Sequence, residues 1–259
     1  MNHGGIDPTG FGEAAADYVT HRAGFPPSLL DRLTEFGIGK TDQRVVDLGT
    51  GTGTLARQFA ARGCRVTGID PDQRMLDAAR SLAESGNLAI EFVTGRAEST
   101  GLPSKSADVV TAGQCWHWFD GERAANEVLR LLIPEGLLAI CHFDWIPLPD
   151  NAVQATERLI KKHNPAWNLG GGHGMWPQWA PVLQTAGFVQ LETFSFDAKV
   201  PYSHEAWRGR IRASAGITAL NDERTVAFDR DLERLLAERF PGELHLDHRV
   251  WCLVARSPR

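Results

Sequence analysis

The stretch RVVDLGTGTGTLARQFAARG, residues 44–63, decides the fold. Its apolar start is typical of a strand buried on both faces of a sheet, and its second half has the spacing of a helix. Between them, Gly49, Gly51 and Gly53 allow a tight turn and let a ligand approach main-chain N–H groups. This order predicts the first unit of an α/β sheet with a ligand at the turn.

The same alternation continues outward from this stretch. Four further strands are expected, at 65–70, 89–95, 108–114 and 137–143. Helical patterns lie at 28–36, 72–86, 121–132, 202–214 and 229–240, and Ser28 is the expected N-cap of the first. Strands about 20 to 30 residues apart, alternating with helices, predict right-handed βαβ units and a parallel sheet. Residues 187–196 and 248–256 predict an antiparallel hairpin at a sheet edge. Residues 145–181, rich in Trp, Pro and Gly, are expected to form a loop-rich insert.

Composition excludes several classes of protein. The chain has 259 residues, a net charge of −5, and 27 basic against 32 acidic side chains, so it lacks the electrostatic footprint of a nucleic-acid-binding protein. No run approaches the roughly 18 apolar residues of a membrane span, and the start lacks a signal-peptide core. We therefore expect a cytoplasmic protein without nucleic-acid or membrane partners. The four cysteines show no paired spacing and read as free thiols. No metal site is predicted, because His142, Asp144, His173, His245 and His248 lack paired ligand spacing.

Two acidic residues indicate which kind of ligand the glycine turn would bind. Asp47, at the mouth of the glycine turn, would repel phosphate and suits a ligand that carries an ammonium or sulfonium charge. Asp70 ends the second strand, where a carboxylate can accept two ribose hydroxyl groups, although N-capping of the next helix is compatible with this position. Met75, one turn further on, could pack on an adenine ring or in the helix core. The pattern predicts a positively charged adenosine ligand.

At this point the sequence resembles the class I S-adenosylmethionine-dependent methyltransferases of the small-molecule, type 11-like group, and is similar to the trans-aconitate methyltransferases. The matching stretches are VVDLGTGTGTLA, GIDPDQRML, GRAESTGLP, ADVVTAGQCWHWFD and LRLLIPEGLLAI. The resemblance covers residues 11–143. It implies a Rossmann-like, doubly wound, seven-stranded α/β sheet, mostly parallel, with an antiparallel C-terminal hairpin strand. One domain is expected, with N-terminal cap helices (1–39), a cofactor core (40–143), a substrate roof (144–215) and a C-terminal helix and strand (216–259).

The resemblance implies that S-adenosylmethionine is the cofactor, and it assigns residues to that cofactor. The family often has Asp at the position of Arg96, so this residue departs from the pattern. The expected cofactor residues are Tyr18, Arg22, Asp47, Gly49, Thr50, Gly51, Gly53, Asp70, Pro71, Met75, Arg96, Ala97, Glu98 and Gln114.

Methyl transfer needs in-line positioning and, for an O–H or N–H nucleophile, removal of a proton. His117 follows the carboxyl end of the fourth strand and is the candidate base. The alternative is that it has a structural role in the wall around the cofactor. Arg208 and Arg212 share a helix face and could clamp a carboxylate, or could form an ion-paired surface. Residues expected around the acceptor are Trp118, His142, Trp145, His173, Trp176, Trp207, Arg208 and Arg212.

The predicted function is transfer of a methyl group, by in-line SN2 displacement, to an O, N or activated C nucleophile of a small molecule. A specialised metabolite or a small carboxylate is the expected acceptor, and the protein is expected to be a monomer or a homodimer. Two alternatives remain open: an RNA or protein methyltransferase, and a non-catalytic adenosine-binding protein of the same fold.

Overall fold

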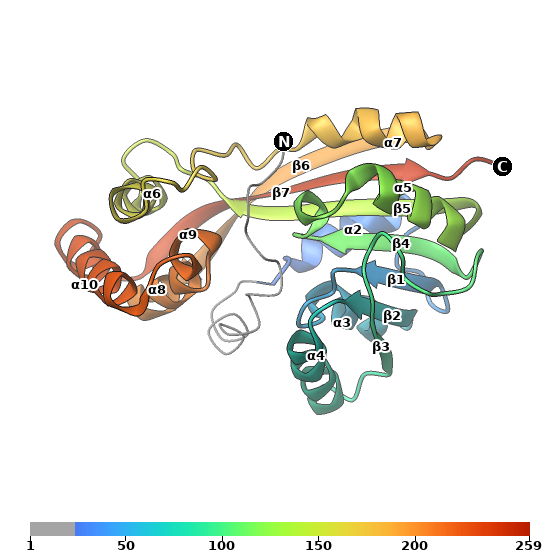
Figure 1. The fold of residues 1–259 in the computed structure, drawn as a ribbon, viewed down its shortest axis with the longest axis horizontal. Coiled ribbons are helices and arrows are strands. Elements are labelled where there is room, and N and C mark those ends of the chain that lie inside the picture. Colours follow the sequence, from blue (N-terminus) through green and yellow to red (C-terminus); the bar gives the residue numbers. More distant parts are fainter. Residues whose placement is uncertain (1–23) are drawn as a thin grey trace. The chain divides into compact units, whose positions relative to one another are not determined.

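The computed structural model describes residues 24–259 and divides them into two compact units (Figure 1). Among the described residues, unit 2 consists of Gly24–Phe143, Trp176–Phe196 and Val250–Arg259, and unit 1 of Asp144–Met175 and Asp197–Arg249. Each unit is described by itself below. None of the described helices is long and apolar enough to cross a bilayer.

One seven-stranded sheet has the order β3-β2-β1-β4-β5-β7-β6. The neighbours from β3 to β5 are parallel; for example, Val46 of β1 lies opposite Thr67 of β2 and Val110 of β4. This mostly parallel sheet confirms the predicted fold class. The strands are β1 (Arg44–Leu48), β2 (Arg65–Asp70), β3 (Ile90–Thr94), β4 (Ala107–Gly113), β5 (Leu132–Trp145), β6 (Val189–Tyr202) and β7 (Leu244–Arg256).

The last two strands are antiparallel to their neighbours, as predicted. Along β5 and β7, Gly136 bonds to Ser257 and Cys141 lies beside Cys252, so residue numbers rise in one strand as they fall in the other. The pairs Asp197–Arg249 and Gln190–Arg256 show the same relation between β6 and β7. At this side of the sheet the edge strand is therefore β6, and the final strand, β7, lies between β5 and β6 rather than at the edge.

The helices of unit 2 follow from local signals in the sequence. Asp72 and Asp120 cap α4 and α5, because each carboxylate accepts a hydrogen bond from a main-chain N–H in the first turn. The first described helix begins at Pro27, with Pro26 as its N-cap, so the prediction of Ser28 as the cap was wrong. These helices are α2 (Pro27–Glu35), α3 (Thr54–Ala61), α4 (Gln73–Ser85), η2 (Trp116–Trp118), α5 (Gly121–Leu131), η3 (Pro177–Trp179) and α7 (Ala180–Ala186).

The core of unit 2 is an apolar layer between the sheet and helices α5 and α7. Because side chains alternate along a strand, every second residue of β1, β4, β5 and β7 points to these helices. The buried strand residues of this layer are Val46, Leu48, Val110, Ala112, Leu138, Ile140, Trp251, Leu253 and Ala255. The same alternation places His142 on this face, at the carboxyl end of β5.

Unit 1 has its own core, built around the fully buried Trp207 and Phe228. Residues 145–181 were expected to be loops, but they include α6, which Asn151 caps through its side chain. Helix α10 packs on both α6 and α8. The helices of this unit are α6 (Ala152–His163), α8 (His204–Arg212), α9 (Ala215–Thr218) and α10 (Asp222–Arg239).

Candidate functional site

The turn between β1 and α3 is built on glycines in the left-handed region. Gly49, Gly51 and Gly53 have φ values of 58°, 55° and 77°, which other residues rarely adopt. A side chain at Gly49 would also come within 2.8 Å of Cβ of Cys115. The glycines therefore bring main-chain N–H groups close to the ends of β1 and β2, as the sequence pattern indicated.

Asp47 is a buried carboxylate at this turn. Its two oxygens accept hydrogen bonds from the hydroxyl groups of Thr50 and Thr111, both at 2.7 Å. Burial raises the pKa of Asp47 to about 6, the two hydroxyl bonds oppose this rise, and the charge of Asp70 adds to it. The carboxylate is ionised at neutral pH, but it is only about one pH unit from protonation.

Asp70, at the end of β2, binds the turn through its carboxylate. One carboxylate oxygen accepts from the main-chain N–H of Gly51 and the other from that of Asp72, both at 2.9 Å. Burial raises the pKa of Asp70, and these two bonds oppose the rise. Because a carboxylate oxygen accepts more than one hydrogen bond, Asp70 can still receive two hydroxyl groups. Asp72, not Asp70, is the N-cap of α4.

Four further predicted cofactor residues lie in the first turn of α4 or in the loops after β2 and β3. Met75 is buried, and its Cε lies 3.9 Å from the position that a Cβ of Gly51 would occupy. Pro71 is exposed. Of the residues after β3, Ala97 is buried, and the carboxylate of Glu98 accepts from the N–H of Asp120 at 2.9 Å.

Of the other four predicted cofactor residues, the structure describes two. The side chain of Arg96 is 71% exposed and lies 3.8 Å from Glu98, so it extends along the surface of the unit. Gln114 has a positive φ of 60° and donates through its side chain to the carbonyl oxygen of Phe143. Tyr18 and Arg22 lie outside the described residues.

Beyond Gln114, two histidines and several tryptophans form an aromatic group in unit 2. The ring of His117 lies 5.4 Å from that of His142, and it is nearly parallel to Trp176 at 5.9 Å. Trp118 lies 4.6 Å from His117. Trp176 in turn stacks on Trp179 at 5.0 Å. The structure therefore brings together four predicted residues, His117, Trp118, His142 and Trp176.

The other predicted acceptor residues lie in unit 1, and the two tryptophans among them serve its packing. Trp207 is fully buried and donates to the hydroxyl of Thr156 at 3.0 Å. Trp145 contacts it edge to face at 5.4 Å and donates to the carboxylate of Glu157 at 2.9 Å. His173 is exposed, and its carbonyl oxygen accepts from Arg249. Trp207 is thus a core residue rather than a wall of a binding surface.

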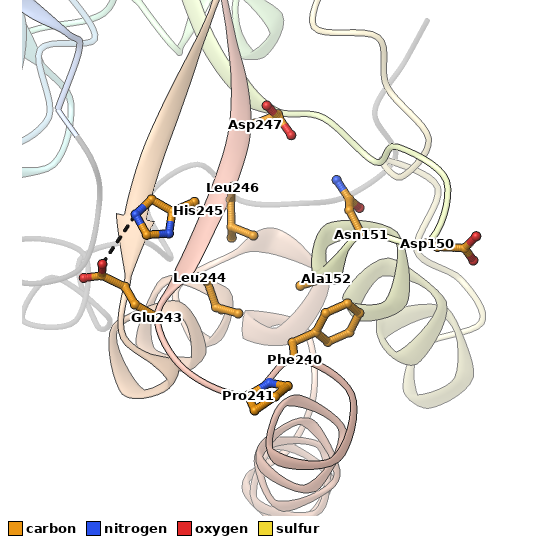
Figure 2. Close-up of a pocket in the computed structure, with 10 residues that line it drawn as sticks. All are labelled: Asp150, Asn151, Ala152, Phe240, Pro241, Glu243, Leu244, His245, Leu246 and Asp247. Atoms are coloured by element: carbon orange, nitrogen blue, oxygen red, sulfur yellow. Dashed lines mark ion pairs between the residues drawn. The ribbon is translucent and has the colours of Figure 1, made fainter.

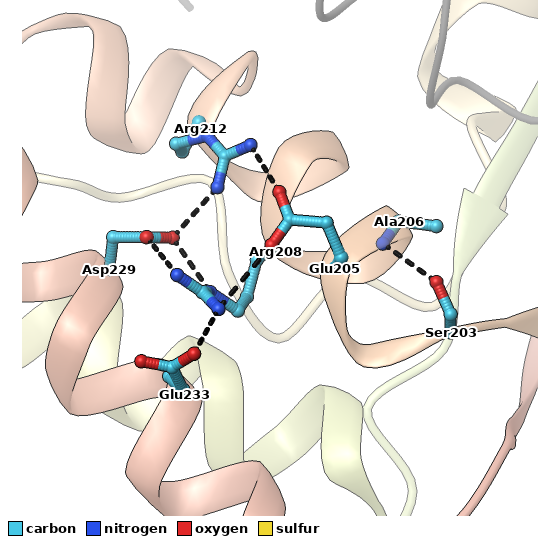
Figure 3. Close-up of polar contacts among 7 residues, drawn as sticks. All are labelled: Ser203, Glu205, Ala206, Arg208, Arg212, Asp229 and Glu233. Atoms are coloured by element: carbon cyan, nitrogen blue, oxygen red, sulfur yellow. Dashed lines mark hydrogen bonds and ion pairs between the residues drawn. The ribbon is translucent and has the colours of Figure 1, made fainter.

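Arg208 and Arg212 form an ion-paired network instead of an open clamp (Figure 3). Both guanidinium groups donate to the carboxylate of Asp229 on α10. Arg208 also pairs with Glu233 at 2.6 Å, and Arg212 pairs with Glu205 at 2.9 Å. A substrate carboxylate would have to displace these partners, so the structure favours the ion-paired alternative.

Unit 1 contains a pocket of about 350 Å³ that the sequence did not indicate (Figure 2). None of the predicted acceptor or cofactor residues lines it. At its rim, His245 pairs with Glu243 at 3.4 Å, and Asp247 pairs with Lys199 at 2.8 Å. Among the described residues, no three His, Cys, Asp or Glu side chains are grouped as metal ligands would be.

Sequence reasoning missed three residues around these groups. Thr111 bonds to Asp47 across neighbouring strands, and its only signal was a hydroxyl within the apolar run of β4. Trp179 extends the aromatic group. Arg210 stacks on Trp145, and its signal was its position on the opposite helix face from Arg208.

A protein family, two relatives and a solved structure are similar to this chain. Residues 46–140 match a family described as "Methyltransferase domain". A methyltransferase-like protein of Schizosaccharomyces pombe is 33% identical over 193 residues, which are 74% of this chain and 72% of the relative. An uncharacterized methyltransferase of the same yeast is 29% identical over 226 residues, 85% of this chain and 84% of the relative. Phosphoethanolamine N-methyltransferase 2 of Haemonchus contortus, solved with phosphomonomethylethanolamine and S-adenosylhomocysteine, shares the fold: the TM-score is 0.60 at 18% identity, over 96% of this chain and 58% of that one.

These findings define the class of protein, a methyltransferase built on a Rossmann-like sheet. More particularly, the chain belongs to the class I S-adenosylmethionine-dependent methyltransferases, and S-adenosylmethionine is its cofactor. The predicted fold, enzyme class and cofactor are confirmed.

The residues at the glycine turn fit this cofactor. The charges of Asp47 and Asp70 repel one another, which contributes to the raised pKa of Asp47. A ligand with positive charge would relieve this repulsion, whereas a phosphate would increase it. A Cβ on Gly51 would have only Cε of Met75 within 4 Å, so the one neighbouring atom at this point of the turn is apolar. We expect Asp47 to face the charged end of the cofactor and Asp70 its ribose.

Proposed function

We propose that this enzyme methylates an O, N or activated C nucleophile of a small molecule, with His117 as the base that accepts the proton. The observation that supports this is the aromatic group at the carboxyl ends of β4 and β5. It combines one partly buried histidine with flat apolar surfaces in the same unit as the glycine turn. The acceptor is a specialised metabolite or a small carboxylate.

The cofactor supplies an electrophilic methyl group. The chain's own residues then have three tasks: to hold the donor at Asp47 and Asp70, to exclude water, and to remove a proton from an O–H or N–H nucleophile. Trp118 and Trp176 lie against the His117 ring and restrict access of water to it. A neutral imidazole nitrogen can accept a proton from an O–H or N–H nucleophile.

The charge of the chain bears on the acceptor. A net charge of −5 and the absence of a basic excess disfavour an RNA acceptor, because affinity for nucleic acid comes largely from phosphate contacts. A small acceptor agrees better with the aromatic surfaces, since small-molecule sites are mostly apolar with a few polar groups.

The test is a set of cofactor titrations followed by a screen of acceptors. Wild-type protein should bind S-adenosylmethionine in the micromolar range by calorimetry. Asp70→Ala should weaken binding about tenfold or more, because two charge-assisted hydrogen bonds are lost. His117→Ala should bind the cofactor normally but lose about a hundredfold in kcat, measured as S-adenosylhomocysteine formed with the acceptor that the screen identifies.

A matched control is Asp77→Asn, on the exposed face of α4. It should leave both cofactor affinity and turnover unchanged. Retained turnover in His117→Ala would refute the base role. A stronger effect of His117→Ala than of Asp70→Ala on cofactor affinity would reassign the ribose site.

A further inference from the structure

Cys141 on β5 and Cys252 on β7 lie side by side, although they are 111 residues apart in the chain. Their Sγ atoms are 3.5 Å apart, and both side chains are fully buried. Both residues belong to unit 2, so the pair lies within one compact unit. The spacing of the cysteines along the chain does not reveal this pair, because the two residues meet only through the order of the strands.

The register of the two strands makes these cysteines direct cross-strand neighbours. Gly136 and Ser257 form a hydrogen-bonded pair, in which the N–H of Ser257 donates to the carbonyl oxygen of Gly136 at 2.9 Å. Five residues forward from Gly136 (136 to 141) and five residues back from Ser257 (257 to 252) lead to the two cysteines. Hydrogen-bonded and non-hydrogen-bonded pairs alternate along an antiparallel ladder, so an odd number of steps leads to a non-hydrogen-bonded pair.

Two further hydrogen bonds agree with this type of pair. The N–H of Ile146 donates to the carbonyl oxygen of Asp247 at 2.9 Å, again five residues from each cysteine, so the register is the same on both sides of the pair. The carbonyl oxygen of Cys141 accepts from the N–H of Gln114, so the main chain of Cys141 is directed to β4 and away from β7. In a non-hydrogen-bonded pair the Cα atoms are about 4.5 Å apart, which is within the range of about 4.4–6.8 Å that a disulfide spans.

Both thiols lie on the same face of the sheet, opposite to α5 and α7. Their neighbours Ile140 and Leu253 belong to the core on the side of those helices, and side chains alternate along a strand. Burial raises the pKa of the Cys252 thiol, and the hydrogen bond with Cys141 adds to this effect. Cys252 is therefore protonated at neutral pH, and an oxidant meets a reactive thiolate at this residue only when the strands open locally.

We propose that Cys141 and Cys252 are a dithiol that hydrogen peroxide converts into a disulfide, and that this disulfide fixes β7 to β5. The thiolate of one cysteine attacks the O–O bond, which gives a sulfenic acid and, after protonation of the leaving hydroxide, one water molecule. The second thiol attacks the sulfenic sulfur, the S–S bond forms and a second water molecule leaves. Two thiols thus lose two electrons and two protons, and the peroxide is reduced to two water molecules.

The crosslink would oppose the opening that allows it to form. It closes a loop between residues 111 apart in the chain, and closure of a long loop restricts the unfolded chain. Because β7 lies between β5 and β6, its separation from β5 breaks the sheet. Oxidation would therefore make this separation harder, whatever acceptor the enzyme methylates.

The experiment treats the reduced, folded full chain with hydrogen peroxide, blocks the remaining thiols with iodoacetamide in denaturant, and maps the peptides by mass spectrometry. Wild-type protein should yield two peptides joined through Cys141 and Cys252. A urea concentration below the unfolding transition should speed the crosslink, because β7 opens more often there. The crosslinked protein should have a urea midpoint higher by about 1 M or more, and dithiothreitol should reverse this shift.

Cys64→Ala is the matched control, because it removes another buried thiol of unit 2, whose Sγ lies 3.3 Å from the carbonyl oxygen of Lys40. It should crosslink as wild type does, whereas Cys252→Ala should lose both the crosslink and the shift in midpoint. Three results with wild-type protein would overturn the proposal: no joined peptides after peroxide treatment, a crosslink through Cys64 or Cys115 instead, or a midpoint that does not rise. The wild-type peptide map decides even if Cys252→Ala fails to fold.

Discussion

At the scale of single residues, two buried carboxylates with different partners lie beside the glycine turn between β1 and α3. Asp47 is held by two threonine hydroxyls, whereas Asp70 is held by two main-chain N–H groups. Burial raises the pKa of both carboxylates, so keeping them ionised costs stability. Such a cost is expected where function requires a charge that folding does not.

The first prediction concerns how the ionisation of Asp47 makes the free energy of unfolding and the cofactor affinity depend on pH, and it is tested with Asp47→Asn. The folded pKa of about 6 lies above the unfolded value of about 4. Between these values the folded protein keeps a proton that the unfolded chain has lost, so the free energy of unfolding falls as pH rises through this window. Cofactor affinity should rise over the same range, because ionised Asp47 attracts positive charge.

Asp47→Asn removes this titration. We expect the variant to bind S-adenosylmethionine more weakly at neutral pH, and its affinity to stay nearly constant from about pH 5 to about pH 8. Its free energy of unfolding should equal or exceed that of wild type above pH 6. Calorimetry and urea unfolding across this range measure both. A wild-type affinity that did not change between pH 5 and pH 7 would contradict the role of Asp47.

At the scale of elements, the strand, turn and helix of residues 44–61 form one unit whose turn is fixed by a neighbouring loop. The close approach of Gly49 to Cys115 joins the turn to the loop after β4. Cβ of Cys115 is fixed to the main chain, so a side-chain rotation cannot relieve a clash there. The turn is therefore specified by space as well as by its backbone conformation.

The second prediction compares two glycines with similar backbone angles. Cys115 lies within 3 Å of the position that a Cβ on Gly49 (φ 58°) would occupy, whereas a Cβ on Gly101 (φ 76°) would have nothing within 4 Å. Gly101→Ala should lower the free energy of unfolding by about 1 kcal/mol, from backbone strain alone. Gly49→Ala should lower it by about 3 kcal/mol, because overpacking adds to the strain. Urea unfolding measures the difference, and equal costs would show that the contact with Cys115 relaxes.

The elements also show what could be read from the sequence. The glycine turn and the position of Asp70 at the end of β2 were predictable because their signals lie in short stretches of sequence, a strand followed directly by a turn and a helix. The bond from Thr111 to Asp47 was not, since it depends on β4 lying beside β1, a fact of strand order. Helix α6 had a readable signal, an Asn151 cap before apolar residues at helical spacing, but the density of Pro, Gly and Trp around it hid that pattern.

At the scale of the whole molecule, each of the two units is stabilised by its own hydrophobic core. The core of unit 2 lies between the sheet and helices α5 and α7, while that of unit 1 is built from α6, α8 and α10. Arg208, Arg212 and Asp229 tie α8 to α10 (Figure 3). Burial would raise the pKa of Asp229, but the two guanidinium groups lower it overall.

The third prediction separates stability from cofactor binding. Asp229→Asn leaves two partly buried arginines with fewer partners, so the free energy of unfolding should fall by about 1–3 kcal/mol. Glu233→Gln, at a side chain that is 60% exposed, should change it by less than about 0.5 kcal/mol. Both variants should bind S-adenosylmethionine as wild type does, since neither residue is among those assigned to the cofactor. Thermal unfolding and calorimetry measure the two effects, and weaker cofactor binding in Asp229→Asn would contradict this separation.

The insertion of β7 between β5 and β6 has a consequence for the integrity of the chain. Strand β5 carries the apolar run of residues 137–143, and its outer row of N–H and C=O groups is paired only because β7 lies beside it. Proteolytic trimming of residues 244–259 would uncover that row next to an apolar face. Such an exposed edge is a template for pairing with other molecules, so loss of this short segment would turn the enzyme into an aggregation-prone sheet.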